Sequence, residues 1–266
     1  GQSVLTPYDV LALRLGTASL LLLPFISDLS ARHWRDRRLW CLALLGGVGY
    51  GMLVYAGFKF APAAHGAILL PGLQPFLIAL VLWLWLGTRP ATNSLFGLAA
   101  IGLGISCVAW PLWQNGWSAS LLLGDGLLLL SSMVWAVYSV LAKRWQFNPW
   151  LLTRFVAFGS TAIYLPLYLL VLPKQITVAP WSSVLLQALY QGIGPTIIAM
   201  LLFLKAVSIL GPERTGAMIA LVPVLAGLAA TQVLNEPLSA SLVVGLVLVS
   251  LGAIVAVYPF QRWRTA

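Results

Sequence analysis

Charged residues are scarce in this chain, and acidic residues are the scarcest: 266 residues include only six Asp and Glu, and charged residues make up 8%. Soluble domains carry about 25% charged and roughly 45–50% apolar residues, whereas this chain is 61% hydrophobic. A soluble protein of this size cannot bury so much apolar surface, so we expect lipid as the solvent. The net charge of +9 does not indicate a nucleic-acid partner, because the basic residues lie in short links between apolar runs.

Cysteine and histidine are almost absent, at two residues each. Cys41 and Cys107 both lie in apolar runs, which argues against a disulfide framework. The sequence has no HExxH motif, no paired aspartates and no GxSxG nucleophile, and it has no ATP-binding motif. We therefore expect a protein that is not an enzyme, with no catalytic residue, cofactor or metal site.

Nine apolar runs have the roughly 20 residues that a helix needs to cross a bilayer. The links between them are short, and no run of charge, serine or proline is long enough to mark a soluble domain. This pattern predicts an all-α polytopic membrane protein with a single membrane domain over residues 1–266. The expected spans are 10–27, 39–58, 64–86, 92–113, 121–142, 150–172, 183–204, 215–234 and 240–259.

Basic residues gather in alternate links, which predicts the orientation of the chain. Lys and Arg accumulate on the cytoplasmic side of a membrane, so the richer side is expected to be cytoplasmic, with the C-terminus on it. The other side carries only Lys59 and Lys174, while Arg14 and Arg154 begin spans and are expected to snorkel to the head groups. The richer side carries Arg32, Arg35, Arg37, Arg38, Arg89, Lys143, Arg144, Lys205, Arg214, Arg262 and Arg264.

Glycines and prolines recur at a nearly constant offset, which indicates an internal duplication. The two copies are expected to cover residues 1–117 and 118–266. Three pairs are 150 positions apart and four are 148 apart: Pro62/Pro212, Gly66/Gly216, Ala67/Ala217, then Pro75/Pro223, Gly97/Gly245, Gly104/Gly252 and Pro111/Pro259.

The duplication leaves one span without a partner. The span 121–142 precedes 150–172, whose counterpart is 10–27, and no span before residue 10 matches 121–142. We therefore expect a tenth helix before Gly1. Five helices per copy is an odd number, so the second copy must be inverted in the membrane, and inverted repeats are typical of alternating-access transporters.

The second copy, with Gly216-Ala217, Pro223, Glu236-Pro237, Gly245 and Gly252, resembles the EamA repeat of the drug/metabolite transporter superfamily. The resemblance covers essentially the whole chain and is strongest to bacterial inner-membrane exporters of aromatic amino acids. It implies ten helices in two inverted repeats around a central cavity, and metabolite export from a bacterium across its inner membrane. The first copy departs from the pattern, because Gly87-Thr88-Arg89 stands where the second has Asn235-Glu236-Pro237.

Acidic residues are missing from the middle of every span. Proton-coupled carriers usually place a carboxylate there, so we expect facilitated transport without a proton-coupling carboxylate.

Polar and aromatic side chains that interrupt apolar helix faces are the candidates for the substrate path. Ser131, Trp135, Tyr138 and Ser139 share one helical stripe, and Gln187, Tyr190, Gln191 and Gly194 share another. Gln74 precedes Pro75 near the middle of its span, where an unpartnered amide in lipid would cost several kcal/mol. Tyr50 and Tyr55 lie about 140° apart on an ideal helix. The predicted substrate-binding residues are Tyr50, Tyr55, Gln74, Trp135, Tyr138, Tyr190 and Gln191.

Simpler interpretations stand beside these. Trp and Tyr often anchor membrane proteins at the interface, and Gln187 and Gln191 can bond across helices. A cavity lined by aromatic and amide groups suits an amphipathic solute with a flat part and an ammonium, such as an aromatic amino acid. A multidrug exporter of lipophilic cations, proton-coupled, is the alternative, and a non-transporting scaffold is the third reading. The expected partners are a small-molecule substrate and the lipid bilayer, with a monomer as the working unit.

Overall fold

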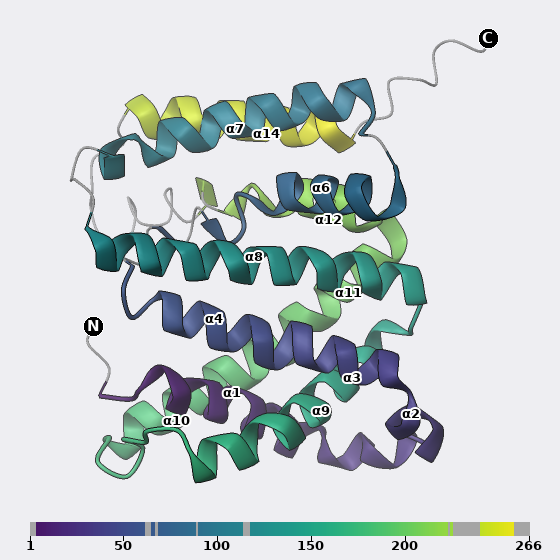
Figure 1. The fold of residues 1–266 in the computed structure, drawn as a ribbon, viewed down its shortest axis with the longest axis vertical. Helices are drawn as coiled ribbons and strands as arrows, with labels where there is room; N and C mark the ends of the chain where they lie inside the picture. The colour runs from purple at the N-terminus through teal and green to yellow at the C-terminus, as the bar shows by residue number, and fades with distance from the viewer. Residues whose placement is uncertain are drawn as a thin grey trace. The chain divides into compact units, whose positions relative to one another are not determined.

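The computed structural model describes residues 4–61, 65–66, 69–88, 90–113, 118–222, 224–225 and 240–257. These residues form helices joined by short links and contain no strand (Figure 1). Three helices depart from α geometry: η1 is a 3₁₀-helix, and η2 and η3 are π-helices. The elements are α1 (Pro7–Leu22), η1 (Leu23–Asp28), α2 (Ala31–Arg35), α3 (Arg37–Ala43), η2 (Leu44–Gly49), α4 (Tyr50–Gly57), α6 (Gln74–Leu86), α7 (Thr92–Trp113), α8 (Ala119–Trp145), α9 (Pro149–Leu170), α10 (Trp181–Gln191), η3 (Gly192–Ala199), α11 (Met200–Leu210), α12 (Pro212–Ile219) and α14 (Ala240–Val257).

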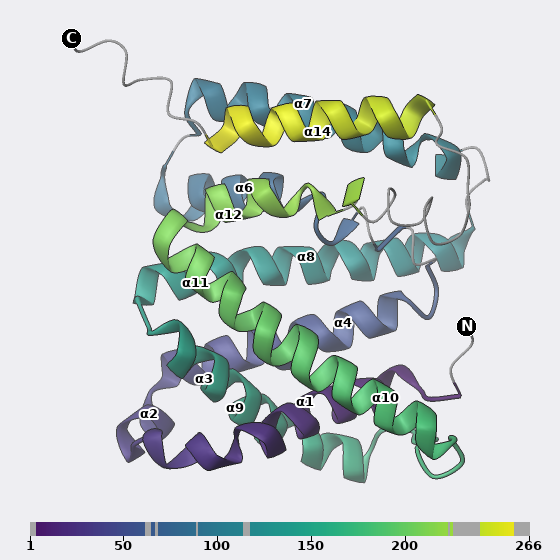
Figure 2. The same cartoon turned by 180° about the vertical axis from the view of Figure 1, so that it is seen from behind.

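Five described helical segments are long and apolar enough to cross a membrane: Pro7–Asp28, Arg37–Gly57, Ala119–Trp145, Pro149–Leu170 and Trp181–Leu210. The last of these joins α10, η3 and α11 into one long rod (Figure 2). Shorter apolar helices cover Gln74–Trp85, Ser94–Cys107 and Val243–Ala256. The prediction of an all-helical polytopic protein is therefore confirmed.

The expected span 64–86 is wrong as one continuous helix. Residues 70–73 form a turn, and α6 begins only at Gln74 with Pro75 in its first turn. Proline lacks a backbone N–H and restricts the residue before it, so it favours a helix start over a helix interior. The expected span 215–234 also has a turn, at residues 220–221, after α12 ends at Ile219, and the part of that span from residue 226 lies outside the described residues.

The chain divides into two compact units, and each takes segments from both halves of the sequence. Unit 1 comprises Gly1–Lys59 and Val137–Ile209, and unit 2 comprises Phe60–Ala136 and Leu210–Ala266. Helix α8 begins in unit 2 and ends in unit 1.

In unit 1, α1 and α9 begin in the same way, 142 residues apart. Thr6 caps α1 and Pro7 follows it, whereas Asn148 caps α9 and Pro149 follows. A polar side-chain oxygen at the cap satisfies amide groups that have no partner within the helix. Proline is preorganised for the first helical position. The two helix starts are therefore encoded by equivalent residues.

Helices α1 and α9 pack antiparallel. The hydroxyl of Tyr164, late in α9, donates to the carbonyl of Tyr8 in the first turn of α1, over 3.0 Å. Ser19 Oγ, in the last turn of α1, lies 2.8 Å from Thr161 Oγ1, near the middle of α9. Ser19 and Thr161 are themselves 142 residues apart in the sequence. Two equivalent hydroxyls thus meet at the point where the helices cross.

The two π-helices of unit 1 also lie at equivalent positions, because η2 begins at Leu44 and η3 at Gly192, 148 residues later. In each case a hydroxyl binds the carbonyl just before the π-helix. Ser160 Oγ donates to Ala43 O over 2.9 Å, and Thr196 Oγ1 donates to Gln191 O over 2.8 Å. A π-helix shifts the backbone hydrogen bonds by one residue and is frequent at functional sites.

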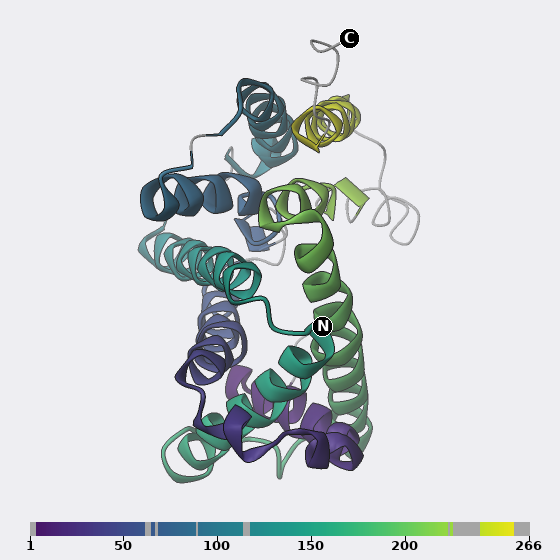
Figure 3. The ribbon, with the colours of Figure 1, turned by 90° about the vertical axis from the view of Figure 1, so that its right-hand side faces the viewer.

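In unit 2, α7 and α14 lie side by side (Figure 3). A Cβ added at Gly97 would lie 2.7 Å from Gly252 O, and one added at Gly104 would lie 2.9 Å from Gly245 O. These four glycines are the two pairs that the sequence places 148 residues apart. Small residues allow membrane helices to approach closely, so the duplicated glycines serve one antiparallel contact.

Candidate functional site

A polar network in unit 1 joins three helices inside the apolar spans. The Nε of Arg14, on α1, donates to Thr196 Oγ1 on η3 over 2.9 Å. Thr196 Oγ1 in turn donates to the backbone oxygen of Gln191 over 2.8 Å, and Tyr55 OH, on α4, donates to Gln191 Oε1 over 3.2 Å. The network therefore connects helices from both halves of the sequence at the π-helix η3.

Tyr50, a predicted substrate-binding residue, and the polar residue Gln187 are associated with this network. Tyr50 is close enough to Arg14 and Tyr55 to interact electrostatically with both. One turn before Gln191, the buried Oε1 of Gln187 has no hydrogen-bond partner within the described part of the chain. A buried acceptor without a partner is costly, so this oxygen is suited to receive a donor from a bound molecule or water.

Three other predicted residues, Tyr138, Tyr190 and Trp135, lie in three different environments. Tyr138 is 0% exposed, and its hydroxyl donates to Met200 Sδ over 3.5 Å. Its ring lies 2.6 Å from the position of a Cβ on Gly46, so it fills the space that this glycine leaves. Tyr190 is 65% exposed and Trp135, half-buried, belongs to unit 2. Tyr138 has a packing role here, and substrate binding by these three residues stays a prediction.

In unit 2, Gln74 lies where the expected span is broken. It is 3% exposed, and its Nε2 donates to the backbone oxygen of Ser132 over 3.1 Å. Ser132 Oγ donates to the carbonyl of Leu69, a group that the break in the helix leaves available, over 2.7 Å. The Oε1 of Gln74 is buried without a partner among the described residues. The amide is thus fixed in place while its acceptor remains available to a ligand.

A His–Asp contact that the sequence did not reveal also lies in unit 2. His65 Nδ1 is 2.9 Å from Asp125 Oδ1, and the two side chains are 12% and 18% exposed. Asp125 lies in the second turn of the spanning helix α8. Ionisable side chains within membrane spans are usually functional. The spacing of 60 residues gives no sequence pattern by which the pair could have been found.

Arg154 corrects another expectation, because it does not snorkel. The residue is 6% exposed, and its guanidinium donates to Phe25 O and to the carboxylate of Asp28. Asp9, in the first turn of α1, is likewise 0% exposed and accepts from Tyr168 OH. Each charge has a partner on another helix, Arg154 of α9 on η1 and Asp9 of α1 on α9, which suits a structural role.

Comparison with known proteins gives the family. The model of the EamA-like transporter family matches residues 1–110 and 122–258. No match was found among the curated proteins. Twenty-eight chains of solved structures match; one, described as "Crystal structure of protein", is 22% identical, with a TM-score of 0.72 over 94% of this chain and 87% of that chain. At this identity the structural likeness shows the fold alone. The family match covers most of the sequence, and the chain therefore belongs to the EamA-like transporters of the drug/metabolite transporter superfamily.

Proposed function

We propose that this membrane transporter exports amino acids and related metabolites, aromatic amino acids among them, by alternating access. The observation that carries the proposal is the network of Arg14, Tyr55, Gln191 and Thr196, which places charged, amide and aromatic groups within the apolar spans. Polar groups at this depth are expensive and usually mark a substrate path.

The chemistry of the network suits an amino acid. Within it Arg14 uses only its Nε, and the rest of a guanidinium is an effective partner for a carboxylate. The rings of Tyr50 and Tyr55 offer stacking to a flat side chain and cation–π contact to an ammonium. The Oε1 of Gln187 is a buried acceptor without a described partner, and it can receive an N–H from a ligand.

Alternating access is supported by the pairing of equivalent helices. Helices α1 and α9 meet at Ser19 and Thr161, and α7 and α14 meet at the duplicated glycines. Antiparallel contact between equivalent helices is what two inverted five-helix repeats, 1–117 and 118–266, would give. In transporters with inverted repeats, one repeat or helix bundle rocks against the other around a fixed substrate site, which opens the site to each side of the membrane in turn. One chain contains both repeats, which favours a monomer as the working unit.

The proposed orientation, with the C-terminus in the cytoplasm of a bacterial inner membrane, is supported in unit 1. The guanidinium of Arg38 lies 5.2 Å from the centroid of the Phe147 ring, which follows α8, and Lys143 donates to Ser208 O near the end of α11. Basic residues from two links, Arg38 and Lys143, thus lie at one end of this unit. Lys174 lies at the other end of α9, 5.9 Å from the ring of Tyr168.

A second candidate is a proton-coupled exporter of lipophilic cations, and the His65–Asp125 pair favours it. Chains of Asp, Glu and His side chains within spans serve as proton relays in pumps and transporters, so a partly buried His–Asp pair in a span suits a proton-coupled carrier. The two candidates differ in whether a pH gradient drives transport.

Uptake of labelled tryptophan into proteoliposomes, with and without an imposed pH gradient, tests both. We expect uptake that ignores the gradient and falls in Trp135→Ala and in Tyr55→Phe. Trp181→Ala is the control, because Trp181 is 85% exposed at the start of α10. Uptake that follows the gradient and loses this response in Asp125→Asn would favour the second candidate. Absence of tryptophan uptake would refute the aromatic substrate and leave the family membership unchanged.

A further inference from the structure

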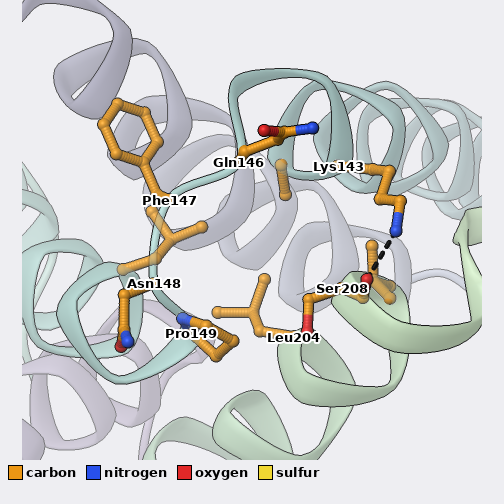
Figure 4. A pocket seen from close by; sticks show the side chains of 10 residues that line it. Lys143, Gln146, Phe147, Asn148, Pro149, Leu204 and Ser208 are labelled. Carbon is orange, nitrogen blue, oxygen red and sulfur yellow. Dashed lines mark hydrogen bonds between the residues drawn. The ribbon is translucent and has the colours of Figure 1, made fainter.

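Unit 1 contains a cavity of about 380 Å³ at the helix ends where its basic residues gather (Figure 4). Lys143 and Gln146 line it from the last turn of α8 and the residue after it, and Leu204 and Ser208 line it from α11. Asn148, the cap of α9, completes the wall. The cavity is thus bordered by three helix ends, and its lining carries amide, hydroxyl and ammonium groups.

The cavity is positively charged. Lys143 Nζ lies within it, held by the backbone oxygen of Ser208, as the dashed line in Figure 4 marks. Arg144 and Lys205 are exposed neighbours in the sequence of two lining residues. The stretch of sequence between Asp125 and Glu213 has no acidic residue, and every residue that lines the cavity lies in that stretch. No carboxylate on the lining segments therefore competes for an anion.

The acid in the adjoining link is already neutralised. Asp36 accepts from the guanidinium of Arg38, which lies over the ring of the lining residue Phe147. This hydrogen bond holds the pKa of the Asp36 carboxyl below its usual range, so the acid stays ionised and paired.

The surroundings of the cavity suit a lipid. Ile209 and Leu210, beside the lining residue Ser208, are exposed and apolar, at 69% and 44%, and acyl chains can lie against them. Trp145 and Trp150 flank the link between α8 and α9, as interfacial tryptophans do. A head group at this depth would have its phosphate at the cavity and its chains along α11.

We propose that this cavity binds the phosphate of an anionic phospholipid, with Lys143 as its principal cationic partner. Basic pockets between spanning helices on the cytoplasmic side bind anionic head groups. The site is separate from the Arg14–Gln191 network and does not depend on which substrate is transported. A bound lipid would hold the ends of α8, α9 and α11 together.

Lipid binding to the full chain in detergent, followed by native mass spectrometry with phosphatidylglycerol, tests the proposal. One lysine near the membrane surface strengthens the binding of an anionic lipid about five-fold. Lys143→Gln should therefore weaken phosphatidylglycerol binding about five-fold, and Lys143→Arg should retain it. Lys174→Gln is the matched control, because Lys174 also donates to a backbone oxygen, that of Leu169, at a helix end outside the cavity. It should bind phosphatidylglycerol as the wild type does.

Three results would overturn the proposal. One is unchanged binding in Lys143→Gln. Another is equal binding of phosphatidylcholine. Competition by inorganic phosphate at the lipid's own concentration would assign the cavity to a free anion and not to a lipid. If Lys143→Gln does not fold, the wild type decides the matter, because a binding constant for phosphatidylglycerol that ignores added NaCl would exclude an ionic site.

Discussion

Replacing Gly104 by alanine should destabilise the protein, because the α7–α14 contact leaves no room for a methyl group. The added Cβ would lie 2.7 Å from Val249 Cγ2 and 2.9 Å from both Gly245 O and Val249 N. Two of these neighbours are backbone atoms, so a rotamer change cannot relieve the overlap. Overpacking of a closely packed contact costs about 1–3 kcal/mol, and the helices must separate to accommodate it.

Gly126→Ala is the matched control for this prediction. Gly126 is also helical and in unit 2, but a Cβ there would meet nothing within 4 Å. Alanine is favoured over glycine in a helix by about 0.5–1 kcal/mol, and this gain applies to both variants, so they should differ by the overpacking cost of about 1–3 kcal/mol. Unfolding in detergent, followed by the fluorescence of the 12 tryptophans, should show Tm values separated by roughly 2–12 °C. Equal Tm values would refute the contact, and with it the pairing of the duplicated glycines.

Three further substitutions follow from the buried polar groups, each measured by thermal unfolding in detergent. Tyr168→Phe removes the hydroxyl that donates to the buried Asp9 and should cost about 1.5–3 kcal/mol, as for hydrogen bonds to charged groups. Arg154→Gln should cost about 3 kcal/mol, the low end for a broken buried pair, because its aspartate partner is half exposed. Gln74→Leu should change stability by less than about 1 kcal/mol, since it removes the bond to Ser132 together with an oxygen that has no partner among the described residues. The same variant should lower tryptophan uptake.

Two of these variants have a matched control. Tyr164→Phe removes a bond to the neutral backbone oxygen of Tyr8 and should cost only about 0.5–1.5 kcal/mol. Arg144→Gln changes an exposed arginine and should leave Tm unchanged. A Tyr168→Phe loss no larger than that of Tyr164→Phe would contradict the charged acceptor. Wild-type uptake by Gln74→Leu would remove Gln74 from the substrate path.

Hydropathy predicted the helices and the class of protein because the lipid solvent determines it. Glycine spacing predicted the close helix contact because local packing determines it. A helix in lipid must be apolar over its whole length, so its position can be recognised from composition. The glycines at 97, 104, 245 and 252 were recognisable because close helix approach allows few alternatives. The break before Gln74 was not predicted, although Pro71 and Gly72 in the turn are a recognised turn signal, because the hydropathy of the run is continuous.

The candidate site could be predicted only in part. Tyr55 and Gln191 were both expected on the substrate path, but their hydrogen bond joins residues 136 positions apart, a separation that no helical period reports. The π-helices η2 and η3 also escaped prediction, because they change the angular position of later residues without a distinctive composition. Arg154 was expected to snorkel, and its burial depends on Phe25 and Asp28 in another part of the chain.

Counterflow most directly tests whether this chain is an alternating-access carrier. Proteoliposomes are loaded with unlabelled tryptophan and diluted into a trace of labelled tryptophan, and the label inside is followed with time. Alternating access predicts a transient accumulation of label above the outside concentration, reduced in Gln191→Leu. Label that only approaches the outside concentration would indicate a channel, and no entry of label beyond that of protein-free vesicles would contradict the proposed substrate.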